Sequence, residues 1–275
     1  MPQLQQKAVK KLPLLKPNHN SEFFRMLIYG ATGVGKTRLA CTACDLEDLK
    51  PVLMCDADLG LASVADRDFD VVRVNNMSDL EMVNNYIRAH RGEYRTVIVD
   101  SLTALYNALV RERLRMPGRT AKQDMYVPDQ SDWLHGTFRM RLVIQQFKTA
   151  PVNFIATAMV DYRTDEATGV KMTLPGLSKK LAEQVGGEFD VVGFLGTKTA
   201  KGKVVRTLQI QPYGNRDAKG RIPASFPPLP PVLENCTVGE VYLHVTKGIE
   251  ITSGIAIEEK HSANLSKSNG RSTSA

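Results

Sequence analysis

Residues 26–44 read MLIYGATGVGKTRLACTAC, and this stretch decides the fold of the chain. Its first four residues are apolar and predict a buried strand, while Leu39, Ala40 and Ala43 follow at helical spacing. Between them, residues 30–37 form a complete G-x-x-x-x-G-K-[ST] loop. A strand, a glycine loop and a helix in this order are the context in which the motif holds nucleotide phosphates. The sequence therefore predicts a P-loop.

Each part of this loop has a task in holding a nucleoside triphosphate. The glycines let backbone N–H groups approach phosphate oxygens closely, and the helix that follows directs the positive end of its dipole at the anion. Lys36 would supply positive charge to the β- and γ-phosphates, and Thr37 a hydroxyl to Mg²⁺. We therefore expect ATP and Mg²⁺ as cofactors. The expected nucleotide-binding residues are Gly30, Ala31, Thr32, Gly33, Val34, Gly35, Lys36, Thr37 and Arg38.

The composition is that of an ordinary globular protein with a moderate positive charge. The 275 residues are 43% hydrophobic and carry a formal charge of +7, which suits one α/β domain with arms. The four cysteines lack the spacing of a zinc site and indicate reduced, buried thiols. No apolar run approaches the ~20 residues that cross a bilayer. We expect a cytoplasmic, soluble protein with no membrane partner.

Two further apolar segments end in aspartates. Residues 51–60, PVLMCDADLG, carry Asp56 and Asp58, and residues 96–101, TVIVDS, carry Asp100. In an open parallel sheet, chemistry gathers at the carboxyl ends of the strands. Asp100 fits the Walker B carboxylate that holds the water shell of Mg²⁺ opposite Thr37. The pattern leaves two roles open for Asp58, which are chemistry in the site or a part in a turn.

Two basic segments suit the backbone of a nucleic acid. Residues 111–122 hold five basic residues and one acidic residue, with Tyr126 and Trp133 beyond them, and a second basic loop is expected at 160–177. Cations with interleaved aromatic rings bind phosphates and stack on bases. The alternative is a solvated helix end with Trp133 in the core. The candidate DNA-binding residues are Arg113, Arg115, Arg119, Lys122, Arg163 and Lys171.

The rest of the chain predicts helices, a hairpin and two arms. Ser78 and Ser131 are expected to cap helices, and Thr157 lies in an apolar strand at 153–159. Residues 189–194 and 204–210 predict a hairpin with Gly202 in its turn. The expected organisation is a flexible basic arm at 1–21, an ATPase domain at 22–232, a small C-terminal extension at 233–257 and a disordered tail at 258–275.

The loop at 30–37, the Asp-Ala-Asp at 56–58 and the Val-Ile-Val-Asp-Ser at 97–101 together resemble the RecA-type ATPase core. The resemblance covers about residues 24–224. The segments 175–177, 189–192 and 218–221 look like the phage-encoded RecA-like proteins, some of which act in single-strand annealing or recombination. The resemblance to the RecA-type core implies an α/β fold. The expected fold is a RecA-like P-loop NTPase core with a mostly parallel central sheet, flanking helices and a C-terminal antiparallel hairpin extension.

The resemblance also implies roles for individual residues. Asp58 would be the catalytic base, where relatives usually carry Glu, and Thr157 would replace the usual Gln sensor, because Met159 stands about at that position. Segments 112–130 and 160–176 would be the DNA-binding loops. The implied catalytic set is Lys36, Asp58, Asp100 and Thr157, with Thr37 and Asp100 on the metal, and Arg216, Lys219 and Arg221 acting across a subunit interface.

The expected function is a DNA-dependent ATPase that acts on single-stranded DNA in phage-type recombination or annealing, in the host cytoplasm if phage-encoded. Because a cation supplied in trans can add ~10³–10⁵ to the rate of phosphoryl transfer, we expect a ring or filament of identical subunits. A single-strand DNA-binding protein is a further expected partner. The alternatives are a replication helicase or loader-type ATPase, a P-loop kinase with residues 111–119 as its lid, and a module that binds ATP but barely hydrolyses it.

Overall fold

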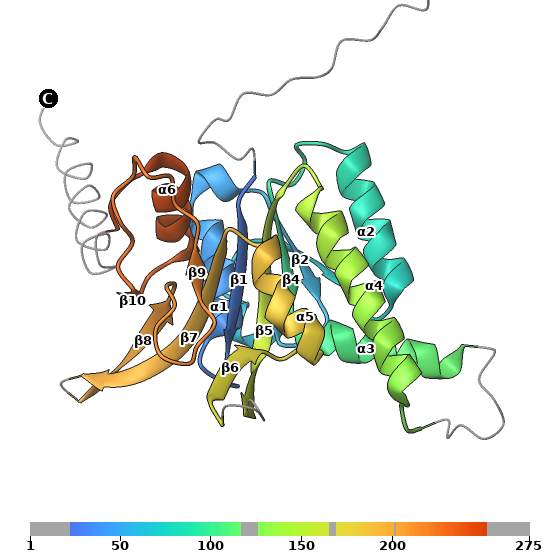
Figure 1. Cartoon of the computed structure of the whole chain (residues 1–275). Helices are drawn as coiled ribbons and strands as arrows, with labels where there is room; N and C mark the ends of the chain where they lie inside the picture. Colours follow the sequence, from blue (N-terminus) through green and yellow to red (C-terminus); the bar gives the residue numbers. More distant parts are fainter. Residues whose placement is uncertain (1–22, 117–125, 165–168, 201, 252–275) are drawn as a thin grey trace, which may run out of the picture.

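A computed structural model describes residues 23–116, 126–164, 169–200 and 202–251 (Figure 1). In this part of the chain a sheet of ten strands forms the centre of the molecule. The strands are β1 Arg25–Gly30, β2 Val52–Asp56, β3 Asp70–Arg73, β4 Thr96–Asp100, β5 Asn153–Thr164, β6 Lys171–Pro175, β7 Val191–Ala200, β8 Lys203–Gln209, β9 Lys219–Gly220 and β10 Val232–Glu234. The α-helices are α1 Lys36–Ala40, α2 Met77–Ala89, α3 Leu102–Arg115, α4 Gln130–Lys148, α5 Lys179–Val185 and α6 Val238–Lys247. Four short 3₁₀ helices are η1 Cys41–Asp45, η2 Glu47–Leu49, η3 Leu61–Val64 and η4 Gly186–Glu188.

The sheet is parallel through most of its width and antiparallel at one end. Its order is β10-β8-β7-β1-β5-β4-β2-β3, with β6 paired to β5 and β9 to β7. Strands β3, β2, β4, β5, β1 and β7 run parallel, whereas β8 and β10 continue the sheet antiparallel. The predicted RecA-like fold class, with its C-terminal antiparallel extension, is therefore confirmed.

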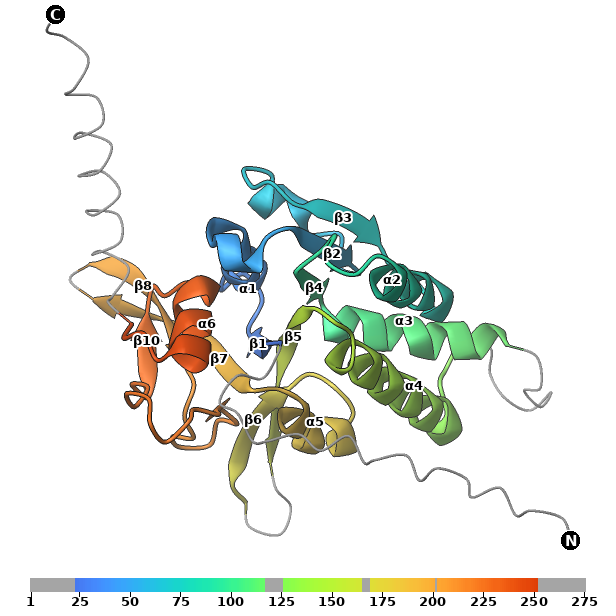
Figure 2. The ribbon, with the colours of Figure 1, turned by 90° about the horizontal axis from the view of Figure 1, so that it is seen from above.

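Helices cover both faces of the sheet, and β1 shows how its sequence fills both layers. Leu27 and Tyr29 belong to the hydrophobic cluster formed with α2, α3, α4 and α5, while Met26 and Ile28 belong to the cluster formed with α1, η1 and α6. Successive side chains of a strand point to opposite faces, so one apolar run serves two cores. Figure 2 shows α2, α3 and α4 together on one side of the sheet.

The capping residues of two helices lie two residues before the expected ones. Helix α2 is capped by Asn76, whose side chain accepts the N–H of Asp79, and not by Ser78. Helix α4 is capped by Asp129, which accepts the N–H groups of Ser131 and Asp132, and not by Ser131. In both cases the capping oxygen belongs to an earlier Asn or Asp, which are among the strongest capping residues.

The segment expected as a loop at 160–177 is mostly a β-hairpin. Strand β5 continues to Thr164 and pairs with β6 from Val160↔Pro175 to Thr164↔Lys171. Val160, Tyr162 and Thr164 are residues that favour strands, and this extends β5 beyond the apolar run. The hairpin at β7 and β8 was predicted correctly, with Gly202 at positive φ in its turn.

The C-terminal part of the described chain shares the core of the domain. Strand β10 pairs with β8, and Val238, Val241 and Val245 of α6 lie in the cluster with α1 and η1. No helix within the described ranges is long and apolar enough to span a membrane. The predicted arm at 1–21 and tail at 258–275 lie outside those ranges.

Candidate nucleotide site

The glycine loop follows β1 at the carboxyl edge of the sheet. Gly33 and Gly35 have φ of +76° and +99°, values that favour glycine because side chains with a Cβ clash there. Gly30 is required for a different reason, since a Cβ at this position would lie 2.3 Å from the carbonyl oxygen of Leu195 in the neighbouring β7. The loop therefore adopts the backbone path that the sequence motif predicts.

Lys36 is the first residue of α1 and is only 9% exposed. Its Nζ donates to the Ala31 carbonyl at 2.9 Å and to Met159 Sδ at 3.5 Å. Burial lowers the pKa of Lys36, an effect that the charges of Asp100 and Asp58 oppose. A buried ammonium whose acceptors are a carbonyl and a thioether would form a stronger, charge-assisted hydrogen bond with a phosphate oxygen.

Asp100 joins three elements of the site at the end of β4. The Thr37 hydroxyl donates to Asp100 Oδ2 at 2.7 Å, and the Thr157 hydroxyl of β5 donates to Asp100 Oδ1. Asp100 is 2% exposed. Burial raises the pKa of Asp100, although both threonine hydroxyls act to lower it. The P-loop threonine, the β4 aspartate and the β5 threonine are thus brought together.

Asp56 and Asp58 have different surroundings at the end of β2. Asp56 is 1% exposed and lies in register with Asp100 of β4. Its Oδ1 accepts the N–H groups of Asp58 at 3.2 Å and Leu59 at 2.8 Å. Asp58 itself is exposed, and its charge acts on Lys36 and Asp100. The turn role that we considered for Asp58 belongs to Asp56, and Asp58 is left accessible beside the site.

The donor set suits a magnesium ion that is bound together with phosphates. A hydroxyl and a carboxylate meet at Thr37 and Asp100, and Asp56 Oδ2 is buried with no hydrogen-bond partner among the described residues. Within the same residues no group of three or more His, Cys, Asp or Glu side chains could hold a metal ion. Mg²⁺ usually keeps several waters and takes only one or two carboxylates besides substrate phosphates, so these residues fit it.

Arg206 of β8 lies on the P-loop and was not expected from the sequence. Its Nε donates to the Val34 carbonyl at 3.1 Å and lies 2.8 Å from where a Cβ on Gly35 would be. Arg38, the expected nucleotide-binding arginine, instead pairs with Asp66 at 3.2 Å. No local sequence pattern predicts the contact of Arg206 with the P-loop. The two are 172 residues apart in sequence, and the β7–β8 hairpin brings them together. A cavity of about 160 Å³ lies beside it, lined among others by Leu39, Thr42, Leu208, Asn235 and Thr237.

The candidate DNA-binding residues are in several environments. Arg115 and Lys171 are exposed. Arg113 lies 3.6 Å from the buried Asp132, and Arg163 donates to Asp161 and to the Leu177 carbonyl, both at 2.6 Å. Two of the four described candidates are therefore engaged within the chain. Arg119 and Lys122 lie outside the described residues.

Trp133 is not a core residue, because it is 42% exposed. Its ring lies 5.9 Å from that of Tyr106.

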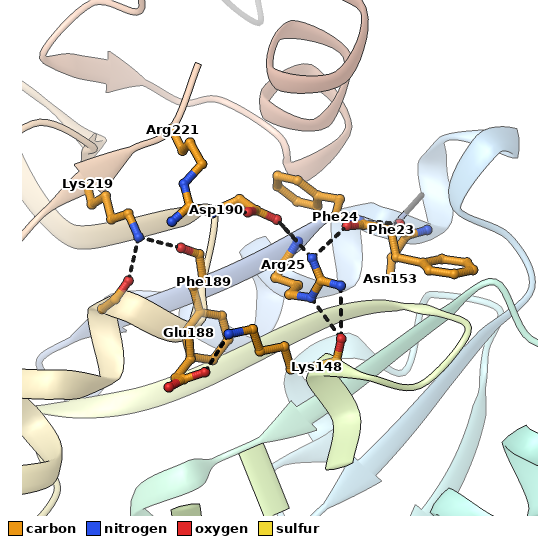
Figure 3. A network of polar contacts seen from close by, with 11 residues as sticks. Phe23, Phe24, Arg25, Lys148, Asn153, Glu188, Phe189, Asp190, Lys219 and Arg221 are labelled. Atoms are coloured by element: carbon orange, nitrogen blue, oxygen red, sulfur yellow. Dashed lines mark hydrogen bonds and ion pairs between the residues drawn. The ribbon is translucent and has the colours of Figure 1, made fainter. Parts of the chain in front are cut away.

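The three residues expected to act on a neighbour's phosphates all have partners in their own chain. Figure 3 shows Lys219, which donates to the carbonyls of Gly186 and Phe189 at 2.8 Å, and Arg221, which lies 3.6 Å from Asp190. Both are at the amino end of β7, at the opposite edge of the sheet from the P-loop. The Arg216 guanidinium lies 4.7 Å from the centre of the Phe194 ring. Their action in trans stays a prediction.

Solved structures with a similar arrangement share little sequence with this chain. The flagellar accessory protein FlaH from Methanocaldococcus jannaschii is 12% identical, with a TM-score of 0.37 over 71% of this chain and 82% of its own. A DnaB-like replicative helicase is 15% identical, with a TM-score of 0.46 over 78% and 55%. A KaiC-like protein from the hyperthermophilic archaeon Pyrococcus horikoshii OT3 is 15% identical, with a TM-score of 0.38 over 68% and 77%. No curated protein matches the chain.

A family profile covers most of the chain. The profile of the AAA domain family matches residues 22–222, which include the P-loop, Asp58, Asp100 and Thr157. The chain thus belongs to the AAA domain family, and its fold is that of a RecA-like P-loop ATPase.

Proposed function

We propose that the protein is a Mg²⁺-dependent ATPase that acts on single-stranded DNA in recombination or annealing of the phage type. The single observation that carries the proposal is the convergence of Lys36, Thr37, Asp100 and Thr157 at the carboxyl edge of the sheet, with Asp58 exposed beside them. This is the arrangement that phosphoryl transfer needs, because its catalysis is mostly positioning and neutralisation of charge.

Each residue has a distinct part in hydrolysis. Lys36 neutralises the charge of the β- and γ-phosphates, while Thr37 and Asp100 would hold Mg²⁺ and its water shell. When bound, Mg²⁺ would neutralise charge that develops on the phosphate oxygens. Asp58 orients the attacking water and accepts its proton, either directly at about 2.6–3.2 Å or through one further water. The water oxygen bonds to the γ-phosphorus as the bond from that phosphorus to the β–γ bridging oxygen breaks, which leaves ADP and inorganic phosphate. Thr157 keeps Asp100 in place through its hydrogen bond.

Strand β5 supports a link between this site and DNA. Thr157 contacts Asp100, and Met159, two residues later, contacts Lys36. The strand then continues into the β5–β6 hairpin, where Gly176 donates to the Met159 carbonyl at 2.6 Å. Tyr162 on this hairpin is 69% exposed and could stack on a base. Met159, which contacts the phosphate-binding Lys36, therefore directly precedes Val160, the first residue of the hairpin.

A homo-oligomer is part of the proposal. The described residues place Arg206 near the P-loop, and cations from a neighbouring subunit would complete the neutralisation of charge. Arg216, Lys219 and Arg221 are the candidates for this role, and a single-strand DNA-binding protein is a further candidate partner.

The test is the rate of ATP hydrolysis with and without single-stranded DNA, measured across protein concentration. We expect stimulation by DNA and a specific activity that rises with protein concentration until assembly is complete. Lys36→Ala and Asp58→Asn should lose hydrolysis, and Asp58→Asn should keep nucleotide binding. A rate that ignores DNA, together with no salt-sensitive DNA binding, would contradict the proposal. Strand unwinding driven by ATP would favour the helicase or loader function instead.

A further inference from the structure

A second cavity lies at the carboxyl edge of the sheet, beside the turn that carries Asp58. It has a volume of about 320 Å³. Ala57 and Asn76 form one wall, where β2 and β3 end, and the second half of α3 forms the other. Helix α3 contributes Arg111, Glu112 and Arg115. None of the nucleotide-site residues lines this cavity, so it is separate from the phosphate loop.

The two arginines of the cavity have no partners within the described residues. Arg111 and Arg115 are exposed and four residues apart, so they lie on one face of α3. Arg113, between them in sequence, lies instead against the buried Asp132. The basic run at the end of α3 therefore divides into one structural arginine and two arginines that face a cavity.

The acidic residue of the cavity wall is already neutralised. Glu112 Oε2 accepts the N–H of Met77 at 3.2 Å, and Glu112 Oε1 lies 3.0 Å from Arg139 Nη1. The carboxylate thus has a donor on each oxygen and does not compete for Arg111 or Arg115. The charge that the cavity offers to a ligand is that of two guanidinium groups.

We propose that this cavity binds the phosphodiester backbone of single-stranded DNA, and that Arg111 and Arg115 are the residues that contact its phosphates. The proposal rests on the proposed function. Guanidinium groups present planar pairs of donors that match phosphate oxygens. Asn76 belongs to the same wall, and while its side-chain oxygen caps α2, its amide nitrogen is a further donor.

The position of the cavity gives the bound DNA a route to the site of hydrolysis. Ala57 lines the cavity and donates its N–H to the Asp100 carbonyl at 2.7 Å. The next residue is Asp58, whose N–H is held by Asp56 Oδ1. A phosphate in the cavity therefore contacts the turn that positions Asp58. DNA bound here acts on hydrolysis through this turn as well as through the β5–β6 hairpin.

The experiment uses the full chain with Arg111→Gln/Arg115→Gln, and Arg91→Gln as the matched control. Arg91 is also exposed, and it lines a different cavity beside Pro151 and Asn153, at the edge where β5 begins. Binding of a fluorescent oligo-dT is titrated by anisotropy at several salt concentrations. We expect the double variant to lose at least about tenfold in affinity, with a slope of log K against log salt smaller by about 1.4, the value for two phosphates of a single strand. Arg91→Gln should bind like the parent.

The outcomes separate this inference from the proposed function. If the parent does not bind oligo-dT, the proposed function fails. If the parent binds and the double variant matches Arg91→Gln in affinity and salt slope, the cavity is not a DNA site. Arg111→Lys/Arg115→Lys guards against misfolding, because it keeps the charge and should recover most of the salt slope. Inorganic phosphate is titrated as a second probe. If the double variant loses as much affinity for inorganic phosphate as for each contacted phosphate of oligo-dT, the cavity binds a single anion, and the inference is overturned.

Discussion

Charged side chains lie at both edges of the sheet, but they have partners within the chain at the amino edge and few or none at the carboxyl edge. At the amino edge, the Arg25 guanidinium donates to the Lys148 carbonyl at 3.0 and 2.9 Å and faces Asp190 at 3.7 Å. Lys148 in turn pairs with Glu188 at 2.8 Å (Figure 3). At the carboxyl edge, the hydrogen-bond acceptors of Lys36 among the described residues are a carbonyl and a thioether, and Arg111 and Arg115 have no side-chain partners in the same part of the chain.

This difference separates charges that hold the fold from charges that are available to a ligand. A buried charge with several partners cannot be removed without leaving those partners unsatisfied. A charge with weak or absent partners contributes little to folding and can bind an anion. The residue type does not tell the two apart, since arginine and lysine occur at both edges.

The largest expected effect is that of Lys36→Ala, which should lower the affinity for nucleotide without lowering stability. Loss of two charge-assisted hydrogen bonds to phosphates costs about 3 kcal/mol or more, which is over about 100-fold in Kd. The melting temperature should change little, because the ammonium has weak partners in the chain. Isothermal titration with ADP and Mg²⁺, alongside calorimetric unfolding, measures both quantities. Nucleotide affinity close to that of the parent would contradict the assignment of the P-loop.

Asp190→Ala, at the amino edge, should lower stability and leave nucleotide affinity unchanged. Asp190 Oδ2 accepts the N–H of Arg25 at 3.1 Å, and both Arg25 and Arg221 lie within 3.7 Å of its carboxylate. Removing it should cost about 2–3 kcal/mol of unfolding free energy, because Arg25 is left partly buried without its carboxylate. Urea unfolding measures this cost. A matching loss of nucleotide affinity in the folded variant would show that the two edges are not independent.

Arg221→Ala tests whether the amino edge also serves a neighbouring subunit. The side chain is 64% exposed, so its ion pair should contribute less than about 1 kcal/mol to stability. If Arg221 acts in trans, the rate of hydrolysis at saturating protein should fall at least about tenfold, while ADP binding to the monomer stays the same. A rate equal to that of the parent at every protein concentration would remove Arg221 from the trans set.

The smallest expected effect is on the reactivity of the thiols at neutral pH, since Cys41, Cys44 and Cys55 are buried and Cys236 is half-buried. Burial raises the pKa of Cys41, Cys55 and Cys236 to about 12 and that of Cys44 to about 11. The unfolded thiols ionise near pH ~8.5, so stability should be unchanged below that pH and should fall as the pH rises from about 8.5 towards 11. Iodoacetamide at pH 8 should label all four thiols of the unfolded chain but not Cys41, Cys44 or Cys55 of the native protein. Rapid labelling of these three thiols in the native protein would contradict the burial.

The sequence was sufficient for the fold class, because each central strand is an apolar run with its own boundary. It also indicated Lys36, Thr37, Asp100 and Thr157, since P-loop chemistry has a local pattern. It could not find Arg206, whose contact with Val34 depends on how the β7–β8 hairpin folds back. It could not separate Arg113 from Arg111 and Arg115, because their difference depends on Asp132, a residue of another helix. Local patterns identify residue types, whereas partners come from the tertiary structure.

The most direct test of the account is isothermal titration of a slowly hydrolysed ATP analogue, with Mg²⁺ and with EDTA, into the parent protein, Lys36→Ala and Asp190→Ala. We predict saturable binding to the parent that requires Mg²⁺, its loss in Lys36→Ala, and unchanged affinity in Asp190→Ala under conditions where that variant is folded. A parent protein that does not bind the analogue in Mg²⁺, or a Lys36→Ala variant that binds it as tightly, would contradict the claim that the carboxyl edge is a nucleotide site.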